Sequence, residues 1–377
     1  MQMMTRTLLI YRLTGSPTLL GAVALANAVP MLILSLYGGV IADRVPKKYV
    51  LIIGQISSAV IALLVALALS MGYLSAGNAA SWWILVISSV LQGMVMGLMM
   101  PSRQSIIYEI VSPSELMNAI SLGSMGMNVL RLFAPAITGF LIDAFDFDAV
   151  YYVTAAVYLV SVVFVFFLPK GKVSPRKEAG ALASIKAGLK YIRNETTILL
   201  VLAFSLLAIV LAMPFMQLLP IFTEDILKVG ATGMGILMSV SGGGAIIGSL
   251  VLASLPDKKR GVMMLIAGFI LGLALVGFSF SDSWAFSLAL MAVVGLAQTG
   301  GMTLANTLIQ HYVEDEYRGR VMSILLMQFG LMSFSTFIAG LLSEVLGVQW
   351  AIGGFAAVLV FLAVLGFIFI PRIRKLE

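Results

Sequence analysis

The sequence predicts an all-α membrane protein built from two halves of six helices each. Three observations support this fold class: the composition is too apolar for a water-facing surface, membrane-length apolar runs recur along the whole chain, and a weak internal repeat relates its halves. The chain has 377 residues, of which 60% are hydrophobic and 11% charged, and its mean hydropathy is +1.07. Soluble domains contain about 45–50% apolar and about 25% charged residues, so a soluble globular fold is excluded.

The composition also excludes several functional classes. There are no cysteines and a single histidine, which rules out disulfides, thiolate metal sites and an imidazole-rich metal centre. The glycine run 242–244 lacks the Lys-Ser/Thr of a phosphate-binding loop and lies inside an apolar run, so ATP-driven pumping is also excluded. No cluster of nucleophile, acid and base occurs. We therefore expect no cofactor, no metal, no catalytic residues and no enzyme activity.

Apolar runs define the helices. A transmembrane helix needs roughly 20 mostly apolar residues. Eleven such runs occur, at 18–42, 49–73, 81–101, 118–142, 149–168, 196–222, 231–254, 261–281, 284–310, 321–345 and 350–370. A twelfth, at 1–13, is apolar but short and carries Arg6 near its middle. We expect it to be a first helix that lacks its N-terminal part.

The charges predict the orientation in the membrane. Most of the 23 Lys and Arg lie in alternate connections, whereas the other connections carry Arg12, Lys228 and several acidic residues. Cytoplasmic loops are enriched in Lys and Arg, so the basic side is expected to be cytoplasmic, together with the C-terminus. This asymmetry explains the net charge of +6 without nucleic acid as a partner. The predicted location is the plasma (inner) membrane.

An internal repeat divides the chain. A shift of 202 places Gly93 on Gly295 and Ser121 on Ser323, at matching ends and starts of apolar runs. Two six-helix halves related by a parallel repeat are typical of many secondary transporters. We expect an N-terminal half at 1–168 with an incomplete first helix, a linker at 169–195 and a C-terminal half at 196–377.

The linker has a helical pattern of its own. Leu182, Ile185, Leu189 and Ile192 recur at helical spacing, and basic residues lie on another face. This pattern predicts an amphipathic helix on the anionic inner leaflet. The alternative is a flexible tether.

A loop motif follows the second apolar run. Gly39 is followed by Asp43-Arg44 and then by Lys47-Lys48. Glycine permits close helix approach, and Asp43 is suited to accept hydrogen bonds at a helix N-terminus as a latch. Lysines at this depth anchor a turn to the inner leaflet. Arg318 and Arg320 follow three acidic residues, and this cluster is either an inner gate held by salt bridges or a solvated loop.

This motif resembles the signature of the major facilitator superfamily. Further stretches resemble the branch that includes the enterobactin exporter and the macrolide-efflux proteins: YRLTGSPTLLG at 11–21, MPSRQSIIYEIVSPSELMNAIS at 100–121, RLFAPAITGFLID at 131–143, LPIFTEDIL at 219–227 and EYRGRVMS at 316–323. The resemblance implies the major facilitator fold over nearly the whole chain. Two positions differ from the antiporter pattern: Ser89 stands where arginine is common, and Ala134-Pro135 where Gly-Pro is common.

Polar residues within the apolar runs are candidates for the transport pathway. Arg131 lies roughly ten residues into its run, and a charge at that depth must face a cavity or a partner. It is either a contact for an anionic group or a structural residue that bonds backbone carbonyls. Asn27, Gln217, Gln298 and Gln328 are the other candidates for a substrate cavity, although helix–helix contact is the commoner role of such residues.

These observations predict a secondary transporter that exports small amphiphilic compounds, such as drugs, macrolides or siderophore-like molecules, by alternating access. The family resemblance implies coupling to protons. The expected partners are a small-molecule substrate, the lipid bilayer and protons, with no nucleic acid, and the chain is expected to be a monomer. Two alternatives stay open: an inactive or wrongly started fragment, and an importer of a small organic solute.

Overall fold

The computed structural model describes residues 1–75, 78, 81–112, 114–169, 181–255, 258–326 and 328–376, and within these the chain is helical with no strand. The chain separates into two compact units. The N-terminal unit comprises Met1–Glu178 and Gly230–Gly235, and the C-terminal unit comprises Ala179–Val229 and Ile236–Glu377. The all-α fold class predicted from the sequence is confirmed.

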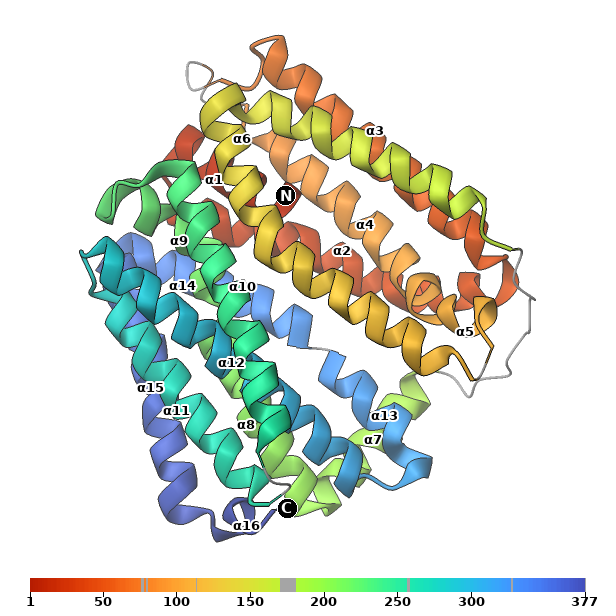
Figure 1. Ribbon diagram of the computed structural model, residues 1–377, viewed down its shortest axis with the longest axis vertical. Helices are drawn as coiled ribbons and strands as arrows, with labels where there is room; N and C mark the ends of the chain where they lie inside the picture. Colours follow the sequence, from red (N-terminus) through yellow and green to blue (C-terminus); the bar gives the residue numbers. More distant parts are fainter. Residues whose placement is uncertain are drawn as a thin grey trace. The chain divides into compact units, whose positions relative to one another are not determined.

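The N-terminal unit contains the first six helices. They are α1 (Gln2–Thr14), α2 (Pro17–Arg44), α3 (Lys47–Ser70), α4 (Trp83–Ser105), the short α5 (Ile107–Ile110) and α6 (Leu116–Phe166). Helix α2 packs along α4, and α3 packs against α4 and α6 (Figure 1). The 51 residues of α6 are interrupted at Asp146, whose φ of 71° and ψ of 176° are not helical. This break separates the two apolar runs predicted at 118–142 and 149–168.

The junction between α1 and α2 follows from three consecutive residues. Gly15 ends α1 with a φ of 61°, a left-handed conformation that glycine adopts without steric cost. Ser16 then caps α2, because its side chain accepts a hydrogen bond from the backbone N–H of Leu19. Pro17 occupies the first helical position, where its missing N–H leaves no helical bond unmade. The Gly-Ser-Pro sequence therefore specifies a tight turn between two helices.

The C-terminal unit is built from the remaining helices, apart from the first residues of α10. They are α7 (Ala181–Asn194), α8 (Thr196–Ala212), α9 (Pro214–Ile221), the π-helical turn η1 (Phe222–Ile226), α10 (Gly230–Ser254), α11 (Arg260–Ser279), α12 (Trp284–Tyr312), α13 (Asp315–Leu326), α14 (Gln328–Leu346), α15 (Val348–Phe369) and α16 (Pro371–Arg374). Helix α11 packs against both α12 and α15 (Figure 1).

The predicted spans can be compared with these helices. Among the described residues, nine helices are long and apolar enough to cross a membrane. One of them is α6, which carries two predicted spans. The run predicted at 321–345 corresponds to parts of α13 and α14. The total of eleven full spans stays a prediction, because these helices are identified by length and composition alone.

The two halves repeat one helix contact. In the N-terminal unit, a Cβ atom added to Gly93 of α4 would lie 2.0 Å from the backbone oxygen of Asn27 in α2. In the C-terminal unit, a Cβ atom added to Gly295 of α12 would lie 1.8 Å from the backbone oxygen of Ser241 in α10. Neither contact leaves room for a side chain. The two glycines that the repeat superposes therefore have the same structural role, a close approach of two helix backbones.

The helix predicted in the linker forms as α7, and it packs on the C-terminal unit. Ile192 is buried in that unit's core, and the ring of Tyr191 stacks on Tyr317 with centroids 4.1 Å apart. Leu189 is exposed, while residues 170–180 and the side chains of Leu182 and Ile185 lie outside the described part. Protein contacts thus cover one side of α7, and its location on the leaflet stays a prediction.

The first residues of α10 belong to the N-terminal unit. Cβ atoms added to Gly139 and Gly235 would lie 2.3 Å from the backbone oxygens of Ala231 and Pro135 respectively. The backbone N–H of Thr232 donates a hydrogen bond to Asp143 Oδ2 at 2.8 Å. Asp143 therefore satisfies one of the unpaired N–H groups at the helix start, where a carboxylate is also favoured by the helix dipole.

Candidate functional site: an uncharged cavity in the C-terminal unit

A cavity of about 620 Å³, partly open to solvent, lies among the helices of the C-terminal unit. Its walls come from α8, α11, α12, α13 and α14, with Met213 from the junction of α8 and α9. Small residues such as Ala208, Gly268 and Gly301 face it, so the helices leave space between them. None of the described lining residues carries a charge. A mostly apolar lining with a few polar side chains is typical of sites that bind small organic molecules.

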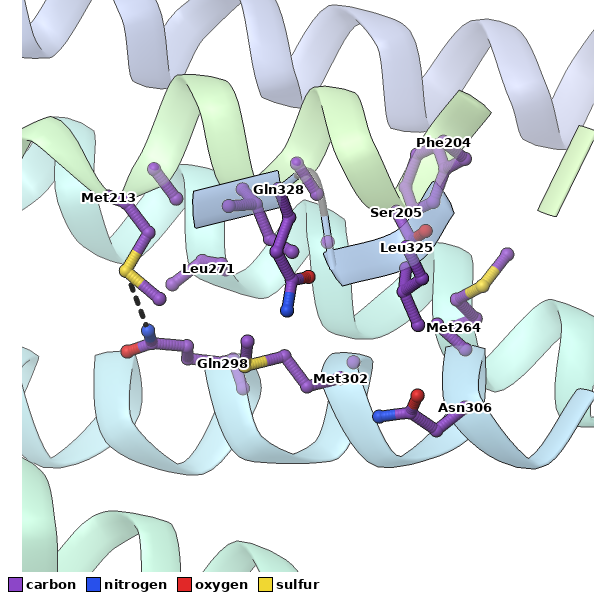
Figure 2. Close-up of a pocket in the computed structure, with 17 residues that line it drawn as sticks. Phe204, Ser205, Met213, Met264, Leu271, Gln298, Met302, Asn306, Leu325 and Gln328 are labelled. Atoms are coloured by element: carbon purple, nitrogen blue, oxygen red, sulfur yellow. Dashed lines mark hydrogen bonds between the residues drawn. The ribbon is translucent and has the colours of Figure 1, made fainter. Parts of the chain in front are cut away.

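One face of α12 supplies much of the lining. Gln298, Met302 and Asn306 follow one another at a spacing of four residues and therefore lie along one side of the helix. Figure 2 shows these three side chains along α12, with Gln328 extending toward them from the opposite wall. The amide groups of Gln298, Asn306 and Gln328 thus lie in one apolar space.

The hydrogen bonds within the cavity are weak or local. The amide Nε2 of Gln298 donates to the sulfur of Met213 at 3.2 Å, and a thioether is a poor acceptor. Ser205 donates to the backbone oxygen of Leu202 in its own helix. A bound molecule that offers a carbonyl or an ether oxygen would give the Gln298 amide a better partner. The flexible side chains of Met264 and Met302 adapt to ligands of different shapes.

The predicted cavity residues divide between the two units. Gln298 and Gln328 line this cavity. Gln217 is half-buried in α9 and is not among the lining residues. In the N-terminal unit, Asn27 donates a hydrogen bond from Nδ2 to the backbone oxygen of Ser89 at 3.0 Å, which is a helix–helix contact. Arg131 has an exposed side chain on α6.

Sequence reasoning missed several lining residues. Asn306 was not among the candidates, although its spacing of eight from Gln298 places both on one helical face. Phe204 and Ser205 gave no signal, because α8 is apolar all round and its sequence does not indicate which face meets a cavity.

The predicted gating residues are only partly described. Gly39, Asp43 and Arg318 lie outside the part whose side chains the structure describes, and Arg44 is exposed. Arg320 pairs with Glu316 at 3.9 Å, one helical turn away. The latch therefore stays a prediction.

Both lysines of the loop motif have protein partners. Lys47 forms an ion pair with Glu109 of α5. Lys48 donates hydrogen bonds to the backbone oxygens of Phe166 and Leu168 at 2.6 and 2.8 Å, at the C-terminal end of α6. A cation is favoured there, because the last carbonyls of a helix lack partners within it. These contacts join the start of α3 to the ends of α5 and α6.

Glu109→Gln is expected to lower the thermal unfolding temperature of the purified protein. The side chains of Lys47 and Glu109 are only 14% and 20% exposed, so Lys47 would keep a partly buried charge without its counter-ion. The free energy of unfolding is expected to fall by about 1–3 kcal/mol. The double exchange Lys47→Glu with Glu109→Lys restores opposite charges and should recover most of the loss. A double variant no more stable than Glu109→Gln would contradict the role assigned to this pair.

The surface agrees with a lipid environment. Large apolar side chains are exposed, for example Phe164 at 71%, Phe167 at 78% and Leu122 at 71%. Soluble proteins rarely expose extensive apolar surface, whereas lipid tails cover it without cost. Membrane-length helices around an uncharged cavity define a multi-pass membrane protein that accommodates small molecules. The chain belongs to the Major Facilitator Superfamily, which it matches over residues 2–334 and, in a second overlapping match, 227–377. It is therefore a transporter of that superfamily.

Curated relatives cover most of the chain. It is 25% identical over 361 residues to the staphyloferrin A transporter of Staphylococcus aureus, across 95% of this chain and 89% of that protein. It is 26% identical over 370 residues to the uncharacterised transporter YfiS of Bacillus subtilis, across 92% and 83%. The quinolone resistance protein NorA of Staphylococcus aureus is 29% identical over 251 residues, across 65% and 58%.

Solved structures support the fold. An inward-facing bacterial homologue of the human lysosomal transporter Spinster matches with a TM-score of 0.74 at 14% identity, over 99% of this chain and 94% of that one. The inward-open xylose transporter XylE of E. coli matches with a TM-score of 0.72 at 12% identity, over 98% and 93%. At these identities the likeness concerns the fold alone.

Proposed function

We propose that this protein exports small amphiphilic compounds across the plasma membrane, using the proton gradient as its driving force. The observation that carries the proposal is the cavity of the C-terminal unit, which joins an apolar wall to three amide groups and has no charge among its described lining residues. Sugars and phosphate need many hydrogen-bond donors or a cation, and this cavity offers few of either. An amphiphile buries its apolar part and satisfies the amides with a few polar atoms.

The relatives support the same substrate class. One is named for a siderophore and another for quinolone resistance, so proteins similar to this chain handle organic molecules larger than simple ions. The family relation also supports alternating access, in which two halves rock about a central site. Export is the direction implied by the resistance protein's name, and the proton gradient is a common driving force of such carriers.

Transport of rhodamine 123, an amphiphilic dye, tests the proposal. Cells that express the protein should accumulate less dye than control cells that lack it. Dissipation of the proton gradient by an uncoupler should remove this difference. Greater accumulation than in the control would favour the importer alternative. A difference that survives the uncoupler would contradict proton coupling.

The alternative of a wrongly started fragment has its own control. The same assay is run with and without the coding sequence immediately upstream of Met1. Dye export by the extended form alone would support transport and place the start elsewhere. Failure of both forms to change dye accumulation would overturn export of this class of compound.

A further inference from the structure

A buried arginine lies in the N-terminal unit and is not among the lining residues of the cavity described above. Arg6 of α1 is only 8% exposed, and its neighbours Thr5 and Thr7 are buried as well. Within the described residues, Arg6 Nε has no hydrogen-bond partner. Isolated buried charges are costly, and arginine cannot escape the cost by losing its proton.

Two tyrosines of α6 face this arginine. Tyr151 and Tyr158 are seven residues apart and therefore share one side of the helix. Both interact electrostatically with Arg6. The Tyr151 side chain is 1% exposed, and its hydroxyl lacks a hydrogen-bond partner among the described residues.

The surrounding polar groups bond to one another. Tyr158 donates to Gln2 Oε1 at 3.0 Å, and Gln2 donates from Nε2 to Gln92 Oε1 at 3.5 Å. Gln92 in turn donates to Ser58 Oγ at 3.1 Å. This chain of bonds joins α1, α3, α4 and α6. In the described part of the chain, the Arg6 Nε–H, the Tyr151 hydroxyl and the hydroxyl of Thr154, also on α6, are buried without a hydrogen-bond partner.

We propose that Arg6 and the Tyr151 hydroxyl bind a carboxylate group of the transported compound. An anion supplies what the pair lacks: negative charge for the guanidinium and acceptor atoms for both donors. The planar guanidinium matches a carboxylate in a two-bond geometry. The proposal deepens the proposed function by naming carboxylate-bearing amphiphiles as substrates, and it rests on that function only for the link to transport.

A structural role of Arg6 predicts different behaviour. If Arg6 held helices together through backbone carbonyls, its removal would destabilise the ligand-free protein. If Arg6 instead binds the anion of a ligand, Arg6→Gln removes a buried charge that has no counter-ion in the ligand-free protein. The unfolding temperature without ligand is then expected to stay equal or to rise.

Thermal unfolding of the purified protein with benzoate or benzamide separates these roles. The two probes have the same shape and differ in charge. At a concentration about ten times its dissociation constant, benzoate is expected to raise the unfolding temperature of the wild type by about 2 °C, and benzamide by much less. Arg6→Gln should abolish the benzoate effect, and Tyr151→Phe should reduce it. Arg193→Gln, an exposed arginine of α7, is the matched control and should retain it.

Three outcomes would overturn the proposal. One is a wild type that responds equally to both probes or to neither. The second is an Arg6→Gln variant with a lower unfolding temperature and an unchanged benzoate response. The third is loss of the response in Arg131→Gln instead, which would move the anion site to the exposed arginine of α6.

A pair of dyes connects the site to transport. Rhodamine 110 carries a free carboxyl group, and rhodamine 123 is its methyl ester. Arg6→Gln should weaken binding of rhodamine 110 at least tenfold and change that of rhodamine 123 by less than about threefold, since a charge-assisted pair is lost for one dye alone. Equal losses for both dyes would contradict the carboxylate assignment. Failure of the wild type to bind either dye would count against the proposed function, while the benzoate result would still decide the anion site.

Discussion

Gly295→Leu is expected to prevent accumulation of folded protein. A Cβ atom at this position would lie 1.8 Å from the backbone oxygen of Ser241 and 2.7 Å from its carbonyl carbon. These are backbone atoms of α10, so no side-chain movement relieves the clash, and the two helices must separate. Overpacking that side chains can absorb costs about 1–3 kcal/mol, and a forced separation of helices exceeds that range. The stability of a typical domain is only about 5–15 kcal/mol.

The measurement is the yield of monodisperse protein by size-exclusion chromatography after detergent extraction. Gly300→Leu is the matched control, because it lies on the same helix and a Cβ atom there meets nothing within 4 Å. We expect a near-normal yield for Gly300→Leu and a loss of at least tenfold for Gly295→Leu. Similar yields for the two variants would show that the close contact between α10 and α12 is dispensable.

Ala208→Trp is expected to abolish transport without loss of folding. Ala208 faces the cavity from α8, and an indole side chain would occupy much of the space that a substrate needs. Because the cavity is partly open to solvent, the ring is not enclosed on every side, and overpacking is expected to be mild. Export of rhodamine 123 should fall at least tenfold, while the size-exclusion profile stays that of the wild type.

Leu207→Trp provides the control for this prediction. Leu207 precedes Ala208 on α8, but its side chain is 44% exposed and does not line the cavity. This variant should export dye as the wild type does. Transport by a well-folded Ala208→Trp variant would place the substrate elsewhere and contradict the assignment of this cavity.

The sequence alone determined the class and most of the helices. Composition and run length are properties of local segments, and a segment that must satisfy its own backbone in lipid has few alternatives to a helix. The turn between α1 and α2 is also local, because it follows from the three consecutive residues Gly15, Ser16 and Pro17. The repeat that superposes Gly93 on Gly295 also predicts a shared role, because small residues are where membrane helices meet.

The tertiary structure decided which polar residues face one another. Depth within an apolar run indicated Arg131, whose side chain is exposed, and did not indicate that Arg6 is buried. Run position gives the depth of a residue and not the direction it faces, since the neighbours on each side come from distant parts of the chain. Lys47 and Glu109 are 62 positions apart, and the lining of the cavity comes from five helices. Tertiary packing brings these residues together, and the hydropathy of the sequence does not predict such long-range contacts.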